Sequence, residues 1–389
     1  MSDRTLAYIA TISQLDTIPD KDKIIYASLK NLGWQVIVST SYAVGDKVVY
    51  VEIDSILPEK PEYEFLRKRC YSEKHKGFVI SGMKMAGLIS YGLVLKAGSY
   101  AEKPDGFDMT DILGIKKKED DVPETQVAAK TKFEKCIKWL CWKLGIKYRR
   151  KKVGVESGWM PFAHKTDETR IENLPYLFDE EFRGTPVYTT VKLDGQSATF
   201  ALHKESFYIA SRNVILYRKK VQKAIKELNP KTESKTTDNF CKIAATYDIP
   251  AKLNTLKEKE TSAVVVQGEL CGPGIQTNPM GLPRVDFFIF NIYYRSCDNG
   301  QTFLSWEALE TFCNNFHLKT VPLIERRKFD WPDKAALKEY AKGTYESGKD
   351  REGIVIRFDS GENPMPHALV GMSNTWSFKC INDDYLLGK

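Results

Sequence analysis

Short stretches in which apolar and polar residues alternate make up the first hundred positions of the chain, and this pattern predicts strands. Glycines separate the stretches, which cover residues 6–12, 34–39, 47–53, 78–81 and 88–95. Five short strands divided by turn residues are typical of a small barrel of the oligonucleotide-binding (OB) type, and a generic small β domain fits the same pattern about as well. We therefore expect an OB-like β domain over residues 1–100.

The second half of the chain mixes strand-like and helix-like patterns. Strands are expected at residues 188–192, 198–202, 207–210, 263–268, 286–293, 353–358 and 375–381. Helix-like stretches lie between them at residues 216–228, 306–316 and 334–347. The pattern predicts a second domain over residues 156–389 in which strands and helices alternate.

A polar segment and a basic helix-like stretch connect the two halves, over residues 101–155. Residues 116–126 contain Pro123 and no apolar periodicity, so they are expected to be a linker. From residue 130 to 145 the apolar side chains gather on one arc of a helix. The rest of the helix carries four lysines, Lys132, Lys135, Lys138 and Lys143, with Trp139 and Trp142 among them. Such a surface could bind nucleic acid, but a docked helix with solvated lysines explains it equally simply, and a weak membrane contact less so.

The basic residues of the chain are concentrated in part of this segment. The whole chain carries 58 basic and 51 acidic residues, a net charge of +7, whereas residues 116–152 alone hold 13 basic and 5 acidic residues, a net charge of +8. The remainder of the chain therefore sums to −1. Any strong attraction to phosphate that is independent of sequence would be centred on this segment, unless folding gathers basic residues elsewhere.

Composition excludes several classes of protein. At 389 residues, with 42% apolar and 28% charged residues, the chain is an ordinary globular protein. No stretch approaches the roughly 18 apolar residues that a membrane helix needs, and the N-terminus lacks a signal-peptide pattern. The 8 cysteines include no Cys-x-x-Cys pair, and the 5 histidines are scattered, so neither a zinc site nor a disulfide framework is indicated. We expect a soluble intracellular protein that has no membrane as a partner.

The most informative motif is Lys192-Leu193-Asp194-Gly195. In an extended segment residues i and i+2 point to one face, so Lys192 and Asp194 can address the same ligand, while Gly195 allows the backbone to reverse. An amine nucleophile beside a carboxylate suits covalent group transfer. Alone, the motif would be explained better by a surface hairpin with a solvated ion pair.

Further polar clusters follow, each in or beside an apolar strand, where a nucleotide pocket would place them. They are Ser211-Arg212-Asn213, residues 267–276 with Glu269, residues 351–356 with Glu352, and Ser377-Phe378-Lys379. An aromatic strand at residues 287–291 lies among them, and by parity Phe288 and Phe290 share one face. One of these rings could therefore stack on a base.

Taken in order, these motifs resemble the nucleotidyltransferase motifs of ATP-dependent RNA ligases, and most of all the Deinococcus- and Naegleria-type group, which has an OB domain before the transferase. Residues 165–170 and 87–93 also look like that group. The resemblance covers nearly the whole chain except about residues 100–155. It departs from the wider superfamily where Ser377 or Ile381 stands in place of a second lysine near Lys379, and where Asn291 replaces a common acidic residue.

The resemblance implies a fold and a role for each motif residue. The fold would be α+β, an N-terminal OB-like β-barrel followed by an ATP-grasp-like nucleotidyltransferase domain with mixed antiparallel sheets and helices. Lys192 would attack the α-phosphorus of ATP, which requires that the site lower a lysine pKa of about 10.4. Asp194 and Glu352 would hold Mg²⁺ or Mn²⁺ through its waters. The remaining expected ATP contacts are Gly195, Arg212, Glu269 at the ribose, Phe290 on the adenine, and Lys379 at the α-phosphate, with Arg212 also meeting the RNA 5′-phosphate.

We therefore expect an ATP-dependent RNA ligase that seals 3′-hydroxyl and 5′-phosphate ends of RNA, in a nicked duplex, through a lysyl-AMP intermediate. An ATP-dependent DNA ligase and an RNA-capping guanylyltransferase share the lysine chemistry, but both usually carry a barrel after the last motif. A catalytically silent nucleic-acid-binding protein is the remaining alternative, and it would have little reason to retain Lys192, Glu269 and Glu352. Protein partners are not indicated by the sequence.

Overall fold

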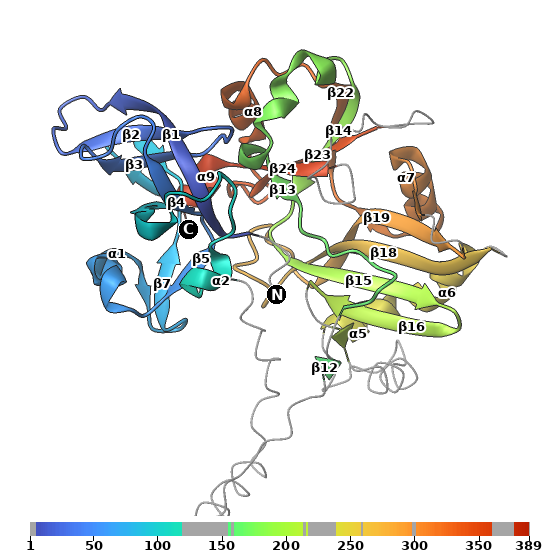
Figure 1. The fold of residues 1–389 in the computed structure, drawn as a ribbon. Coiled ribbons are helices and arrows are strands. Elements are labelled where there is room, and N and C mark those ends of the chain that lie inside the picture. Colours follow the sequence, from blue (N-terminus) through green and yellow to red (C-terminus); the bar gives the residue numbers. More distant parts are fainter. Residues whose placement is uncertain are drawn as a thin grey trace, which may run out of the picture.

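A computed structural model describes residues 5–118, 155–156, 159–212, 215–216, 239–257, 260–297, 301–359 and 377–388. Its strands form an N-terminal barrel and a larger second domain, which lie side by side in Figure 1. The expected basic helix at residues 130–145, with Lys132, Lys135, Lys138 and Lys143, lies outside the described residues. In the described part of the chain, no helix is long and apolar enough to cross a membrane.

The N-terminal domain is built from two antiparallel sheets. The first has the order β10-β4-β1-β2-β3 and the second β11-β5-β7-β6. The strands are β1 (Ala7–Thr17), β2 (Ile24–Leu29), β3 (Gln35–Ser39), β4 (Lys47–Val51), β5 (Ser55–Pro58), β6 (Tyr71–Ser72), β7 (Gly77–Ile80), β8 (Met83–Met85), β9 (Leu88–Ser90), β10 (Leu93–Lys96) and β11 (Lys116–Lys117). Short helices are η1 (Pro61–Leu66), α1 (Arg67–Cys70), η2 (Gly98–Tyr100) and α2 (Thr110–Leu113). This is the expected OB-like barrel.

Strand β4 shows why a barrel forms here. Its side chains are apolar on both faces, so Val49 and Val51 pack in one core cluster while Val48 and Tyr50 pack in the other. All five predicted stretches contain strands, and the last is split into β9 and β10 at Gly92. Gly92 has a φ of +90°, and a Cβ there would lie 2.4 Å from the Val51 carbonyl oxygen, so only glycine fits. The sequence pattern missed β2, β5 and the short β6, β8 and β11.

The second domain contains two larger sheets. One has the order β12-β17-β16-β15-β18-β19-β20, with β21 on β19, and the other has the order β13-β24-β23-β14-β22. Their strands are β12 (Val155–Glu156), β13 (Thr169–Arg170), β14 (Pro186–Lys192), β15 (Gln196–His203), β16 (Ser206–Ser211), β17 (Ile215–Leu216), β18 (Thr261–Cys271), β19 (Asp286–Ser296), β20 (Gln301–Phe303), β21 (Lys319–Thr320), β22 (Leu323–Lys328), β23 (Gly353–Phe358) and β24 (Ser377–Ile381). Most pairs are antiparallel, so this is the expected α+β domain of mixed sheets.

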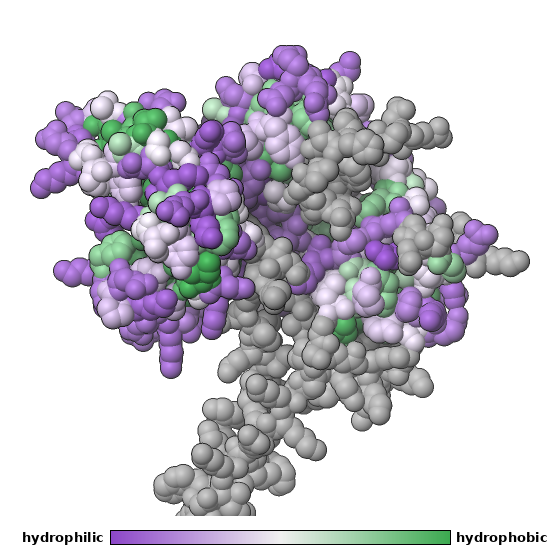
Figure 2. Space-filling view, viewed as in Figure 1, coloured by the Kyte–Doolittle hydropathy of each residue, from purple (hydrophilic) through white to green (hydrophobic). Residues whose placement is uncertain are grey.

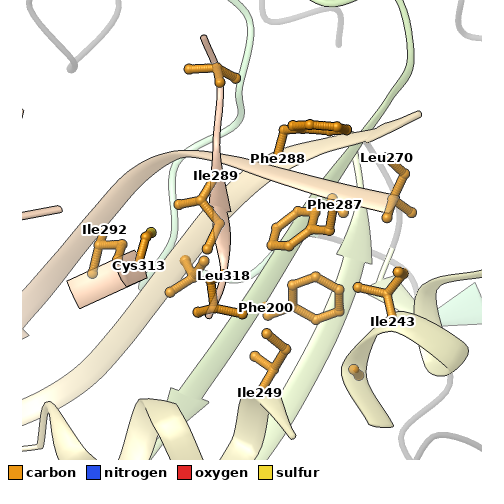
Figure 3. Packing of buried hydrophobic residues seen from close by; sticks show 14 of the residues in the cluster. Phe200, Ile243, Ile249, Leu270, Phe287, Phe288, Ile289, Ile292, Cys313 and Leu318 are labelled. Atoms are coloured by element: carbon orange, nitrogen blue, oxygen red, sulfur yellow. The ribbon is translucent and has the colours of Figure 1, made fainter. Parts of the chain in front are cut away.

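Helices cover the sheets of the second domain. They are η3 (Ile171–Asn173), η4 (Pro175–Phe178), η5 (Glu180–Phe182), α5 (Asn239–Thr246), α6 (Ile249–Thr255), α7 (Trp306–Asn315), α8 (Lys334–Ala341) and α9 (Asp383–Gly388). Figure 3 shows the packing beneath β19, where Phe287 and Phe200 face each other with ring centroids 5.1 Å apart, while Phe288 points to the other side. Burial of these large rings supplies much of the local stability.

The helix predictions were partly wrong in extent. The expected helix at residues 334–347 ends at Ala341, because Gly343 adopts a φ of +143° and the chain turns into a short loop. Residue 216, expected to begin a helix, lies in β17, and residues 217–228 fall outside the described residues. Helices α5 and α6 were not expected.

Candidate active site

A pocket lies where the two sheets of the second domain meet. It encloses about 430 Å³, counting space open to solvent. Strand β14 contributes Lys192, β18 contributes Glu269 and β19 contributes Phe290. The other lining residues are Thr166, Glu168, Thr190, Val191, Leu193, Val321, Val355 and Arg357. Three residues singled out in the sequence, far apart along the chain, therefore share one cavity.

Lys192 ends strand β14, and its ammonium forms an ion pair with Glu352. Lys192 Nζ lies 2.6 Å from Glu352 Oε2, and both side chains are about one-fifth exposed. Burial alone would lower the pKa of Lys192, but the negative charges of Glu352 and Glu269 outweigh it and raise that pKa above its usual value. The sequence led us to expect that burial or nearby cations lower this pKa, and in the absence of added cations burial alone does not achieve it. Any lowering must come from positive charge added to the site.

The turn after Lys192 is shaped by close packing. Gly195 was expected to let the backbone reverse, but its φ does not lie in the left-handed region. A Cβ at Gly195 would instead lie 2.3 Å from the Leu270 carbonyl oxygen and 2.8 Å from both Cys271 Sγ and Glu269 Cγ. Glycine is required here because the turn presses against strand β18, next to Glu269.

Asp194 is buried at this turn and lies beside groups that the sequence did not indicate. It is 6% exposed. The Tyr385 hydroxyl of α9 lies near Asp194 and Glu352, and burial followed by the charges of these two carboxylates raises the pKa of Tyr385. Tyr385 thus brings the C-terminal helix to the carboxylates, and no motif spacing could have predicted it.

Glu269 lies on β18 next to Gly268, opposite Phe288 of β19. Burial raises the pKa of Glu269 to about 8, with the Lys192 ammonium opposing this shift and the Glu352 carboxylate adding to it. The same environment raises the pKa of the neighbouring Cys271 thiol. Burial is thus the main cause of both shifts, and the nearby carboxylates add to it.

A β-bulge sets the position of Phe290. On β19 the register steps from Asn291 opposite Gln267 to Ile289 opposite Gly268, so Phe290 is the extra residue. Its ring lines the pocket, and the Arg357 guanidinium carbon lies 5.5 Å from the ring centroid. The simple parity argument did not foresee this bulge.

Arg357 and Glu168 line the pocket beside Phe290, and the sequence assigned neither a role. Arg357 is 4% exposed, and its Nη2 donates to Glu168 Oε1 at 3.2 Å. Among the described residues, Nε and Nη1 of Arg357 have no hydrogen-bond partner. The pair therefore presents a buried donor edge to the pocket.

Arg212 and Lys379 meet on one carboxylate. Arg212 Nη2 and Lys379 Nζ lie 2.6 Å and 3.0 Å from Asp167 Oδ1, and Lys117 Nζ of the barrel lies 2.6 Å from Asp167 Oδ2. Most of the described surface seen in Figure 2 is hydrophilic, with smaller hydrophobic areas between. Asp167 belongs to the segment 165–170 that resembled the ligase group, but no role for it or for Lys117 was expected.

The side chains that could act as metal ligands restrict the kind of metal site that could form. In the described part of the chain, no three His, Cys, Asp or Glu side chains are grouped so as to hold a metal ion. Asp194 and Glu352 are close enough that both raise the pKa of Tyr345 and of Tyr385. Two neighbouring carboxylates fit a hydrated Mg²⁺ or Mn²⁺ held through its waters.

Comparisons with known proteins agree with these motifs. Residues 185–367 match the RNA ligase family, and residues 6–97 match an OB-fold domain. The chain is similar to the RNA ligase of Naegleria gruberi solved with PPi, with 24% identity over 98% of each chain and a TM-score of 0.73. A mutant of that ligase solved with ATP and Mn gives the same identity and TM-score, over 98% of this chain and 97% of that one. The resemblance drawn from the motifs is therefore confirmed at the level of family match and fold.

Proposed function

Starting from its RNA ligase domain, we propose that this protein is an ATP-dependent RNA ligase that joins a 3′-hydroxyl to a 5′-phosphate in a nicked duplex through a lysyl-AMP intermediate. One observation carries the proposal. Lys192 lines a pocket together with Glu269 and Phe290, and its Nζ lies 2.6 Å from Glu352. An amine, two carboxylates and an aromatic ring in one cavity are the groups needed to hold a nucleotide and to be modified by it.

In the first step the Lys192 amine attacks the α-phosphorus of ATP. A phosphorus–nitrogen bond forms, the bond to the bridging oxygen breaks, and pyrophosphate leaves. Lys192 must lose one proton beforehand, and Glu352 is the nearest acceptor. Asp194 and Glu352 would hold a divalent cation, and its positive charge would lower the pKa of Lys192.

Other pocket residues would bind the nucleotide. Phe290 offers a ring for the adenine, and the turn at Gly195 brings Glu269 close to Lys192, where its carboxyl group can bond a ribose hydroxyl. Arg212 and Lys379, which share Asp167, are the cations available for phosphate. The Naegleria ligase structures with ATP and Mn support ATP and Mg²⁺ or Mn²⁺ as the cofactors of this chain.

The later steps use the same pocket. AMP passes from Lys192 to the oxygen of an RNA 5′-phosphate, which forms a 5′–5′ pyrophosphate bond and frees the lysine. The RNA 3′-hydroxyl then attacks that phosphate, a phosphodiester bond forms, and AMP leaves. Arg212 is the residue that we assign to the RNA 5′-phosphate, and Lys132, Lys135, Lys138 and Lys143 remain candidates for RNA docking. We also retain the proposed division into an OB-like domain (1–100), a linker with the basic helix (101–155) and a transferase domain (156–389).

The decisive experiment is incubation with α-³²P-labelled ATP and Mg²⁺. We expect an acid-labile protein–AMP adduct that is absent from Lys192→Ala and retained in Lys328→Ala, which removes an exposed lysine of β22. An adduct that persists in Lys192→Ala, or no adduct from the wild-type protein, would refute the mechanism.

The substrate is decided by a panel of nicked duplexes with RNA or DNA on each side of the nick. Sealing only when RNA supplies the 3′-hydroxyl supports an RNA ligase, whereas equal sealing of all-DNA nicks indicates a DNA ligase. An adduct formed with GTP in place of ATP would indicate a capping enzyme. RNA binding without any adduct would indicate a silent binding protein.

A further inference from the structure

Tyr345 lies in a short loop after α8, and two features fix its position. Its backbone N–H donates to the Lys349 carbonyl at 2.8 Å, and Thr344 and Asp350 form a β-bridge that closes the loop. The ring is 7% exposed and packs in the main core cluster of the second domain. A ring held at both its backbone and its face leaves the hydroxyl little freedom to move.

The Tyr345 hydroxyl makes three hydrogen bonds, all to backbone atoms of the two central motifs. It donates to the Lys192 carbonyl at 2.9 Å. It accepts from the Asp194 N–H at 3.1 Å and from the Glu352 N–H at 3.1 Å. A phenol has one proton to donate and two lone pairs to accept with, so its whole hydrogen-bonding capacity is spent on these residues.

These bonds lie where two strands separate. β14 and β23 pair in antiparallel register, and Lys192 opposite Gly353 is the last pair between them. Beyond that pair, the Asp194 turn and Glu352 leave the ladder, and both N–H groups need other acceptors. The Tyr345 hydroxyl oxygen is the acceptor for both N–H groups, so both strand ends are bonded to the same atom.

We propose that Tyr345 is a positioning residue for the ligase reaction, one that fixes Lys192, Asp194 and Glu352 relative to one another. The inference rests on the proposed function, because it concerns the residues to which that function assigns the nucleophile and the metal. Tyr345 acts through their backbones and need not touch the substrate. Misplacement of a nucleophile by about 1 Å can cost roughly 100-fold in rate, so loss of the hydroxyl should act mainly on the chemical step.

The test is Tyr345→Phe, which removes the hydroxyl and keeps the ring. At saturating ATP and Mg²⁺ we expect self-adenylylation to slow by about 10- to 100-fold, with the KM for ATP changed by less than about threefold. Tyr340→Phe is the matched control, because the Tyr340 hydroxyl also makes hydrogen bonds, but to the side chains of Glu325 and Thr189, which do not line the pocket. The control should keep the wild-type rate.

A second readout does not depend on activity. Deuterium exchange followed by mass spectrometry should show faster exchange in the peptides that contain Asp194 and Glu352, because their N–H groups lose their acceptor. The replacement Tyr345→4-aminophenylalanine keeps the donor to Lys192 but has only one lone pair, so an intermediate rate is expected. This variant also decides the question if Tyr345→Phe fails to fold.

Two results would overturn the inference. One is a wild-type adenylylation rate in Tyr345→Phe or Tyr345→4-aminophenylalanine, even with a lower melting temperature, since that would show a structural role only. The other is a rate loss shared equally by Tyr340→Phe. Absence of the adduct from the wild-type protein is a different result, which refutes the proposed function and with it the role of Tyr345.

Discussion

At the scale of single residues, the carboxyl groups of the pocket influence one another's pKa. Asp194, Glu269 and Glu352 face Lys192 and Arg212, and their mutual repulsion adds to burial in raising the pKa of Glu269 to about 8. At neutral pH Glu269 therefore retains a proton for most of the time. A neutral carboxyl group can donate a hydrogen bond as well as accept one, which suits a ribose hydroxyl.

Glu269→Gln is expected to change how stability depends on pH. Between its usual pKa of 4.5 and about 8, folded Glu269 holds a proton that the unfolded chain has released. The wild-type free energy of unfolding should therefore fall as pH rises through this window, and the amide should remove that fall. Urea denaturation at pH 5 to 9 measures it, with the exposed Glu260→Gln as control. Parallel pH profiles for Glu269→Gln and the wild type would contradict the expectation.

Gly195→Ala should be strongly destabilising, because its Cβ would lie 2.3 Å from the Leu270 carbonyl oxygen. Gly184→Ala is the control, since Gly184 has a φ of +78° but nothing within 4 Å of a Cβ. We expect about 1 kcal/mol for the control and about 2–4 kcal/mol for Gly195→Ala. Chemical denaturation gives both values, and equal losses would contradict close packing as the reason for glycine at position 195.

Sequence alone could locate the residues that stand in or beside strong strands, such as Lys192, Glu269 and Phe290. It could not locate residues whose role depends on contacts between distant segments. Tyr345 is separated from Asp194 by 151 positions, and its loop has no periodicity that marks it. The Glu168–Arg357 pair, 189 positions apart, was missed for the same physical reason.

At the scale of secondary-structure elements, the sequence pattern predicted most of the long strands, but it missed several others, such as β2, β5 and β22, and it missed the irregularities. The stretch expected at residues 286–293 is strand β19, but its bulge at Phe290 arises from pairing with β18 and has no local signal. Helix α8 ends early at Ala341, where Lys342 is already extended and Gly343 follows with a φ of +143°. Pairing with β18 therefore altered the regular alternation expected for β19, and the turn at Gly343 shortened the helix expected from apolar periodicity.

The start of α8 offers a test of local stability. The Asp333 carboxylate accepts a hydrogen bond from the Ala336 N–H at 2.8 Å, so Asp333 caps the helix. Asp333→Ala should lower the free energy of unfolding by about 1 kcal/mol. Asp330→Ala is the control, because Asp330 is exposed and pairs only with Arg327 among the described residues. An equal loss in both variants, measured by urea denaturation, would argue against the cap.

At the scale of the whole molecule, the barrel and the second domain are joined by polar contacts that are mostly shielded from solvent. The Gly33 N–H donates to the Glu172 carbonyl at 2.7 Å, and the Trp34 indole donates to Asn173 at 2.5 Å. Arg170 pairs with Asp54 of the barrel at 2.6 Å. The sequence predicted both domains but not this junction, because pairings between domains leave no periodic trace in the chain.

Lys338 lies at the centre of that junction. Its ammonium is 2.6 Å from Glu172 and 3.0 Å from Asp383 of α9, and it lies 5.1 Å from the ring centroid of Tyr91 in the barrel. Although burial opposes it, the Lys338 charge helps to keep the pKa of Glu172 below its usual value. The Lys338 ammonium thus forms ion pairs with two carboxylates and contacts both domains.

Lys338→Met should therefore cost about 3–5 kcal/mol at pH 7, because Glu172 would be buried without its partner. The loss should be smaller at pH 4, because Glu172 in the variant can take up a proton there at little cost. In the wild type the ion pair with Lys338 still stabilises the fold at that pH, and this stabilisation is lost only as the pH falls through the lowered pKa of Glu172. Lys342→Met, which breaks an exposed pair with Glu339 on the same helix end, should change little. Urea denaturation at both pH values measures the difference, and a loss independent of pH would show that Lys338 acts through packing alone.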